Sequence, residues 1–508
     1  MLVALVAWSA TNIGAQSNKD AKPETLLRWS FVGTKQLATD KNLAVFNDVR
    51  SLPETTALRD AAALNLARHA ASRFTGGKTN AHPHVVPLIQ SLIPDLLQNE
   101  SRFQMDTQGA QDADWILALK LPDAASKEWS KSLTQLATSA EMKGAAADKS
   151  EWVASRDRYK LSFSRSKDWT IIQGGYGGSD SKSAKDFRAA LGKRSGKTAL
   201  DADVNTHLLG KIWGASNLTH YPKLSLKAEP RKDGFQSELI VDYPQDLGIK
   251  PEKWNVPESL VTEPLIGFTA IQGVAKKLNS LGQFRALGAQ QTPNQLFLWS
   301  QALGPFSVSF AADVRNPEGV LDSLTRLLDN KPLPSGVLQR STNTPALVWT
   351  GLPIAVPFVE AAPKPDDGFL LGGLFRAKAP TAKPAPAELF EQLNQKNLVY
   401  YDWEITAHRI RQWIPIWQLY YIVPGRLVPE NTSVSAKFLQ GIKDKLGNST
   451  TVGTLENPRQ IKFTRQSHLG LNAMELVLLS HYLDVADLRS GAPRENQRPT
   501  PAPPAPAP

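Results

Sequence analysis

The sequence predicts an α+β protein with two similar lobes, each containing a largely antiparallel sheet packed against helices. Stretches with the two-residue period of strands are mixed with helical stretches, without the steady strand–helix–strand alternation that accompanies parallel sheets. A strand, a short turn and a helix recur near residues 115, 306 and 398. The chain has 508 residues, 41% of them hydrophobic and 21% charged, which is enough for two globular cores.

The clearest of these units runs from Asn397 to Tyr421. Alternation divides its strand into an aromatic or apolar face, expected in a core, and a second, more polar face. The two faces consist of Val399, Tyr401, Trp403 and Ile405, and of Leu398, Tyr400, Asp402 and Glu404. Thr406 can cap the helix that follows. Pro415 lacks a backbone N–H, so we expect it to kink or split this helix.

The other strands and helices are predicted from the same hydrophobic periodicity and from turn residues. Two strand–helix units precede the one above, two hairpins lie between those two units, and a first strand lies before both. The units are Asp114 to Ala137 and Phe306 to Leu328; the hairpins join Tyr159–Phe163 to Trp169–Ile172 and Lys223–Ala228 to Phe235–Val241; the first strand is Leu26–Gly33.

A weak internal similarity supports duplicated lobes. Residues 28–43 align with residues 265–280 so that Phe31 matches Phe268 and Asn42 matches Asn279. We therefore divide the chain into a signal-like segment, two α+β lobes and a Pro-rich tail without a core of its own. Their bounds are 1–17, 25–255, 256–490 and 491–508.

Composition also predicts the compartment. The first 17 residues form an apolar run that ends at Ala15-Gln16-Ser17, as in a secretory signal, although the usual basic start is missing. No stretch is long and apolar enough to predict a transmembrane helix. We expect an extracytoplasmic protein, either periplasmic or secreted. The absence of cysteine excludes disulfides and every thiolate chemistry.

The positive charge is concentrated in one region. Of the formal net charge of +10, a surplus of eight comes from residues 143–233, which hold eighteen Lys and Arg against ten Asp and Glu. This region is either an ordinary solvated surface or a face for an anionic polymer.

The sequence contains incomplete forms of two motifs, one typical of nucleotide binding and one typical of metal binding. The segment from Gly192 to Thr198 is one residue short of a phosphate-binding loop and follows a helical stretch, so we expect no nucleotide. His82 and His84 have no third ligand nearby in the sequence, so we expect no metal site. No cofactor is predicted.

Asp402 and Glu404 are the best catalytic candidates. Residues two apart on a strand point the same way, about 7 Å apart. That spacing suits the paired carboxylates of an inverting glycoside hydrolase, with Tyr400 as a surface for stacking sugars. The simpler alternative is that both acids form the solvated face of the strand, or pair with Arg409 and Arg411.

Four segments resemble an uncharacterised family of exported bacterial proteins. They are PLIGFTAIQG (264–273), WTGLPIAVPF (349–358), NLVYYDWEIT (397–406) and RQSHLGLNAMELVLLSHYL (465–483). The resemblance implies an exported two-lobed α+β protein and assigns no site. Together these observations favour a non-catalytic structural, envelope or binding role, and the alternative is a polysaccharide-binding protein or a glycoside hydrolase using Asp402 and Glu404.

Overall fold

The computed structural model describes residues 24–75, 82–107, 113–176, 182–192, 197–212, 221–281, 292–304, 306–329, 338–340, 346–349, 356–364, 366, 368–375, 383–422 and 433–484. The predicted signal-like segment 1–17 and the Pro-rich tail 491–508 lie outside these ranges. None of the described helices is long and apolar enough to span a bilayer.

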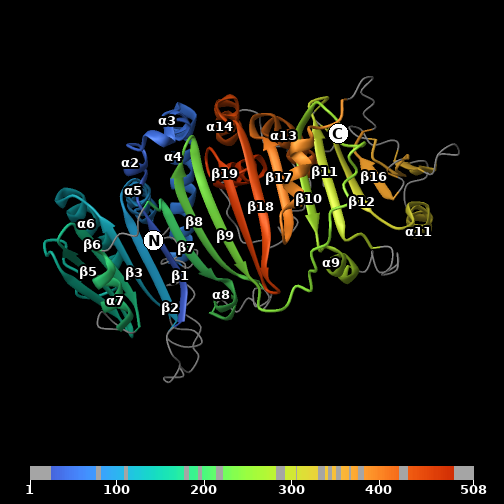
Figure 1. Ribbon diagram of the computed structural model, residues 1–508. Helices are drawn as coiled ribbons and strands as arrows, with labels where there is room; N and C mark the ends of the chain where they lie inside the picture. The colour runs from blue at the N-terminus through green and yellow to red at the C-terminus, as the bar shows by residue number, and fades with distance from the viewer. Residues whose placement is uncertain are drawn as a thin grey trace, which may run out of the picture.

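The described strands form one open sheet of nineteen strands that extends across the molecule (Figure 1). All neighbouring strands are antiparallel, and the helices lie against this sheet, which confirms the α+β class. In spatial order the sheet is β4-β5-β6-β3-β2-β1-β7-β8-β9-β19-β18-β17-β10-β11-β12-β16-β15-β14-β13.

The strands of the first half of the chain are β1 (Glu24–Phe31), β2 (Ser101–Thr107), β3 (Ala113–Lys120), β4 (Trp152–Arg156), β5 (Tyr159–Ser166), β6 (Trp169–Gly175), β7 (Leu200–Asn205), β8 (Lys223–Arg231) and β9 (Gly234–Asp242). Those of the second half are β10 (Leu265–Gln272), β11 (Gln295–Gln301), β12 (Val308–Asp313), β13 (Leu338–Arg340), β14 (Ala346–Trp349), β15 (Phe358–Ala361), β16 (Phe369–Gly373), β17 (Leu398–Ile405), β18 (Asn448–Asn457) and β19 (Gln460–Ser467). Both predicted hairpins, β5–β6 and β8–β9, are confirmed.

The order of pairing from β1 to β9 recurs from β10 to β19, read from the opposite edge of the sheet. The two series meet where β9 pairs with β19. Around this junction the register is symmetric: Glu238 lies opposite Thr464, Leu239 opposite Phe463, and Ser237 opposite Arg465. One sheet therefore runs through both halves, where the sequence predicted a sheet for each lobe. The pairing leaves neither β9 nor β19 with a free edge.

The register of the two halves differs from the sequence alignment by three residues. Gly33 follows β1 with φ of 86°, and Gly273 follows β10 with φ of 83°, each just before a short helix. A Cβ on either glycine would lie 2.6 Å from neighbouring atoms. Only glycine adopts this backbone without strain, so this pair marks equivalent positions better than the predicted match of Phe31 with Phe268.

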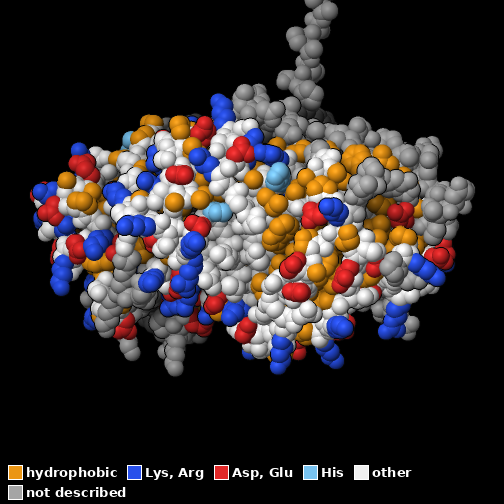
Figure 2. All heavy atoms as spheres, turned by 45° about the horizontal axis from the view of Figure 1, so that its top comes forward, with side chains coloured by type: hydrophobic (Ala, Val, Ile, Leu, Met, Phe, Trp, Pro, Cys, Tyr) orange, Lys and Arg blue, Asp and Glu red, His pale blue; other side chains and the backbone are white. Residues whose placement is uncertain are grey.

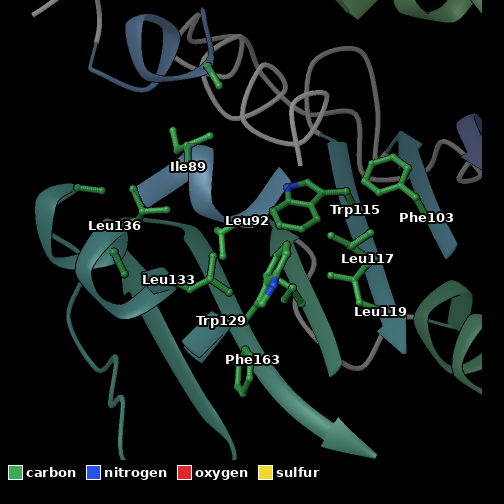
Figure 3. Close-up of a cluster of buried hydrophobic side chains, with 14 of the residues drawn as sticks. Ile89, Leu92, Phe103, Trp115, Leu117, Leu119, Trp129, Leu133, Leu136 and Phe163 are labelled. Carbon is green, nitrogen blue, oxygen red and sulfur yellow. The ribbon is translucent and has the colours of Figure 1, made fainter. Parts of the chain in front are cut away.

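The helices of the first half cover both faces of its strands. They are α2 (Thr34–Leu37), α3 (Ala44–Arg50), α4 (Pro53–Phe74), α5 (Val85–Gln98), α6 (Asp123–Ser139), α7 (Lys182–Ala190) and α8 (Thr206–Ile212), with a 3₁₀ turn η1 (Lys41–Leu43). In Figure 3 the side chains of α5 and α6, among them Leu92 and Trp129, point toward Trp115 and Leu117 of β3. On the opposite face α7 packs on Ile116 and Ile171.

The second half contains α9 (Ala275–Ser280), α11 (Pro317–Asp329), α12 (Ala387–Glu391), α13 (Thr406–Ile422), α14 (Val434–Ile442) and α15 (Ala473–Asp484), with 3₁₀ turns η4 (Gln392–Asn394) and η5 (Lys443–Lys445). The structure bears on two predictions about its central unit. Helix α13 continues through Pro415, so the predicted split is wrong, and a kink at Pro415 stays a prediction. Strand β17 has buried residues on both of its faces, Asp402 and Glu404 on one and Tyr401 on the other, so neither face is solvated as a whole.

Candidate functional site

The carboxylates that the sequence placed on a solvated face are buried. Asp402 is 8% exposed and Glu404 is 4% exposed, because α13 and α15 cover that face of β17. On the opposite face Tyr401 is buried, but Trp403 is only half-buried at the edge of the second-half core. The solvated-face interpretation is therefore wrong, and the predicted core face is less completely buried than expected.

Glu404 holds the beginning of α15. Its Oε1 accepts the backbone N–H of Ala473, the first residue of that helix, at 2.7 Å, and the hydroxyl of Thr406 at 3.0 Å. A carboxylate at a helix N-terminus satisfies one of the free N–H groups and interacts favourably with the helix dipole. Burial nevertheless raises the pKa of Glu404 to about 7; nearby Asp402 adds to this rise, and the bond to Ala473 opposes it.

A second carboxylate holds the same helical turn from the other side. Glu475 forms a capping box with Asn472: its N–H donates to Asn472 Oδ1 at 2.9 Å, and its carboxylate accepts the Asn472 N–H at 3.1 Å. The carboxylate also receives two hydrogen bonds from the guanidinium of Arg465 on β19. The first turn of α15 is thus fixed to both β17 and β19.

Asp402 completes this cluster. Its Oδ1 accepts the hydroxyl of Thr269 on β10 at 2.6 Å, whereas its buried Oδ2 has no hydrogen-bond partner in the described residues. Burial raises the pKa of Asp402 above its ordinary value, and the Thr269 hydrogen bond and the positive charges of Arg409 and Arg465 oppose this rise. Two carboxylates on one strand face thus both have raised pKa values.

The equivalent row in the first half of the sheet is apolar. Four residues lie side by side across β10, β17, β18 and β19, and four across β1, β7, β8 and β9. The first row is Thr269, Asp402, Thr451 and Arg465; the second is Trp29, Ala202, Leu226 and Leu239. The fold therefore does not require charge at these positions. In the second half, Arg465 of this row binds Glu475 of α15 and so links that helix to the sheet.

An apolar groove lies on the outer side of α15, between helices of both halves. Its volume is about 520 Å³. The apolar lining comes from α3, α4, α5, α14, α15 and the segment before α15: Phe46, Val49, Leu58, Leu97, Phe438, Leu469, Leu471, Leu476, Leu479 and Leu483. Two of these side chains, Leu97 and Leu479, are more than 40% exposed. Figure 1 shows α3 and α14 along the same upper edge of the molecule.

The polar residues that line this groove include three cations and no carboxylate. Lys35, Arg50 and Arg59 are all exposed, and they come from α2, α3 and α4. Lys35 Nζ donates to Asn99 Oδ1 at 3.3 Å, and Arg59 pairs with Asp60 at 3.1 Å. An apolar lining with positive charge around it matches a ligand that has an apolar chain and an anionic end.

The residues that the sequence suggested for catalysis and ligand binding do not line this groove. Asp402, Glu404 and Tyr400 are brought together beneath α15, and none of them lines the groove or the other cavity described below. Burial raises the pKa of Tyr400 as well. Its ring packs edge-on against Phe463 at 5.6 Å instead of offering a face for stacking a sugar.

The remaining sequence motifs lie elsewhere. His82 and His84 precede α5, and His84 Nε2 lies 2.7 Å from Ser139 Oγ. The middle of the incomplete phosphate loop, residues 193–196, lies outside the described residues. Among the described residues, no group of three or more His, Asp and Glu side chains is arranged to hold a metal ion.

Sequence reasoning missed the groove because its walls come from segments more than 400 residues apart. One signal was available: Asn472-Ala-Met-Glu475 has the spacing of a capping box. It leads into a helix that is apolar on every side, with Met474, Leu478, Leu479 and Tyr482 exposed. No family model, curated protein or solved structure matches this chain.

Proposed function

We propose that this protein is a non-catalytic, extracytoplasmic binding protein whose groove takes the apolar chain of an anionic amphiphile, such as a fatty acid. The observation that carries the proposal is the groove of about 520 Å³, whose lining is mostly apolar and whose charged residues are all cations. Its size is within the range of about 300–1,000 Å³ that small-molecule sites span.

The expected energetics follow from the lining. Each methylene that enters the groove contributes about 0.8 kcal/mol, so affinity should rise with chain length. Exposed cations such as Arg50 add at most about 1 kcal/mol for an anionic end. A fatty acid should therefore bind only a few-fold more tightly than the alcohol of equal length, and the apolar chain should dominate.

The test uses two neighbouring leucines of α15. Leu479 lines the groove and is 43% exposed, whereas Leu478 is 37% exposed and does not line it. Both positions tolerate a charged side chain as far as folding is concerned, because both are already in contact with solvent. A fluorescent fatty acid is titrated into the wild type, Leu479→Glu and Leu478→Glu.

We expect Leu479→Glu to weaken binding at least tenfold and Leu478→Glu to leave it within twofold. Equal effects of the two substitutions, or no binding to the wild type, would contradict the proposal. A second copy of the chain is a competing occupant of the groove. Sedimentation of the wild type and of both variants in the same buffer tests it, because self-association through the groove would be disrupted by Leu479→Glu alone.

We also infer that the two halves are similar lobes produced by duplication, with the boundary near residue 255. The recurring strand order, the symmetric register around Glu238 and Thr464, and the glycine pair Gly33 and Gly273 support this inference. Membership of an uncharacterised exported family stays a prediction that a resemblance in the sequence supports. Sequencing the N-terminus of exported protein tests the proposed loss of residues 1–17.

The alternative, a polysaccharide-binding protein or glycoside hydrolase using Asp402 and Glu404, retains one supporting observation. The raised pKa of Glu404 is what a general acid needs near neutral pH. Its carboxylate, however, is used to hold α15, and it lines neither described cavity. A polysaccharide hydrolysis screen of the wild type and Glu404→Gln tests this alternative.

A further inference from the structure

A second cavity lies on the other side of α2 from the groove. Its volume is about 570 Å³. Its walls come from the end of β1, from α2 and η1, from the segment before β7 and from the β8–β9 turn. Unlike the groove, it is mainly polar. The polar residues that line it are Gln36, Thr39, Asp40, Asn42, Lys197, Arg231 and Lys232.

The charges in this cavity favour an anion. Lys197, Arg231 and Lys232 are exposed on its walls, against a single carboxylate, that of Asp40. Asp40 is engaged in capping η1, because its carboxylate accepts the N–H of Asn42 at 2.9 Å. Arg231 forms an ion pair with Glu229, with 3.0 Å between Nη2 and Oε2. Lys197 and Lys232 therefore carry most of the free positive charge of the cavity.

Elsewhere on the surface that Figure 2 shows, positive side chains lie among negative ones. Figure 2 shows Lys and Arg side chains spread over the left half of the visible face, with Asp and Glu side chains between them. In the sequence of residues 143–233, ten Asp and Glu are likewise interspersed among the eighteen Lys and Arg. Among the described residues of this region, Lys197, Arg231 and Lys232 line the polar cavity.

The two cavities share α2 as a wall. Thr34 and Lys35 line the groove, and the next two residues, Gln36 and Leu37, line the polar cavity. With its side chains a helix is about 10–12 Å across, so a ligand that occupies both spaces must extend about that far past α2. An apolar space beside a basic one corresponds to the two ends of a lipid with a phosphate-bearing head.

We propose that the polar cavity binds the phosphate-bearing head of a lipid whose acyl chains lie in the groove. This inference rests on the proposed function, because it assigns the groove to the same ligand. A cavity of about 570 Å³ holds a head larger than a carboxylate. Lysine binds phosphate as a point charge, and two lysines with Arg231 would surround the head from two sides of the cavity.

The experiment compares two lipids that differ only in the phosphate. Dioctanoyl phosphatidic acid and dioctanoylglycerol each displace the fluorescent fatty acid from the wild type, from Lys197→Gln/Lys232→Gln, and from Lys131→Gln/Lys160→Gln. The last variant removes two exposed lysines that line neither cavity, so the net charge of both variants is the same.

We expect the wild type and the control variant to prefer phosphatidic acid at least tenfold. In Lys197→Gln/Lys232→Gln this preference should fall below threefold, with the affinity for dioctanoylglycerol unchanged. Binding of both lipids with equal affinity, or a preference that survives the loss of Lys197 and Lys232, would overturn this inference alone. If neither lipid displaces the fatty acid, this inference fails, whereas the groove assignment fails only if the fatty acid itself does not bind or binds equally to Leu479→Glu and Leu478→Glu.

Discussion

Replacing Glu404 by glutamine should remove a pH dependence of stability that this buried carboxyl causes. Its pKa is raised from 4.5 to about 7 in the folded protein. Because the folded state holds the proton more tightly than the unfolded state, Glu404 favours folding below pH 4.5, and this contribution is lost as the pH rises to about 7. A pKa difference of one between the folded and unfolded states corresponds to about 1.4 kcal/mol, so the loss amounts to about 3 kcal/mol.

The side-chain amide introduced by Glu404→Gln would keep an oxygen for the N–H of Ala473 and the hydroxyl of Thr406, but it would not ionise. Relative to the wild type, Glu404→Gln should therefore gain about 3 kcal/mol in free energy of unfolding between pH 4.5 and pH 8. Urea denaturation at several pH values measures this difference, and Glu456→Gln, at an exposed position on β18, should run parallel to the wild type. A constant difference between Glu404→Gln and the wild type across the range would refute the reasoning.

Three other outcomes are expected. Trp403→Ala should lower the free energy of unfolding by about 2 kcal/mol in chemical denaturation, less than for a fully buried ring, since Trp403 is half-buried; a loss above about 4 kcal/mol would contradict its partial exposure. Gly33→Ala and Gly273→Ala should each cost more than about 2 kcal/mol, because both combine positive φ with a Cβ clash, against Asn99 and Ile249 respectively. Intact-mass measurement of exported protein should find residues 1–17 removed, and an intact Met1 would argue against export.

The local elements of this fold could be predicted from sequence because their signals are local. Alternation located β17, and turn residues located the hairpins β5–β6 and β8–β9. Burial of β17 could not be predicted in the same way. Its polar residues Asp402 and Glu404 look solvated until α13 and α15 are placed over them, and α15 comes from a distant part of the chain.

The order of the strands in the sheet could not be predicted from the sequence either. Pairing of β9 with β19 joins segments more than 200 residues apart, and nothing local in either strand selects the other. The alignment of residues 28–43 with 265–280 matches β1 with β10, and it differs by three residues from a match of Gly33 with Gly273, because it was built on aromatic residues. The glycines that the turn geometry requires, Gly33 and Gly273, are the better guide.

The candidate site could be predicted only in part. The sequence singled out Asp402 and Glu404, and the structure places them together, but in a buried cluster that fastens α15 to the sheet. The groove has no local signature, because an exposed leucine such as Leu479 looks like any helix residue. Its meaning depends on Phe46, Leu58 and Leu97, which tertiary packing brings beside it.

The most direct test of the central claim maps where an apolar chain binds. A fatty acid with a photoreactive group near the end of its chain is crosslinked to the intact protein, and the labelled peptides are identified by mass spectrometry. We predict labels within 44–59 and 473–484, the segments containing α3, the start of α4 and α15, and we predict that excess dodecanoate suppresses them. Labels confined to segments that do not line the groove, or labels that dodecanoate does not suppress, would contradict the claim.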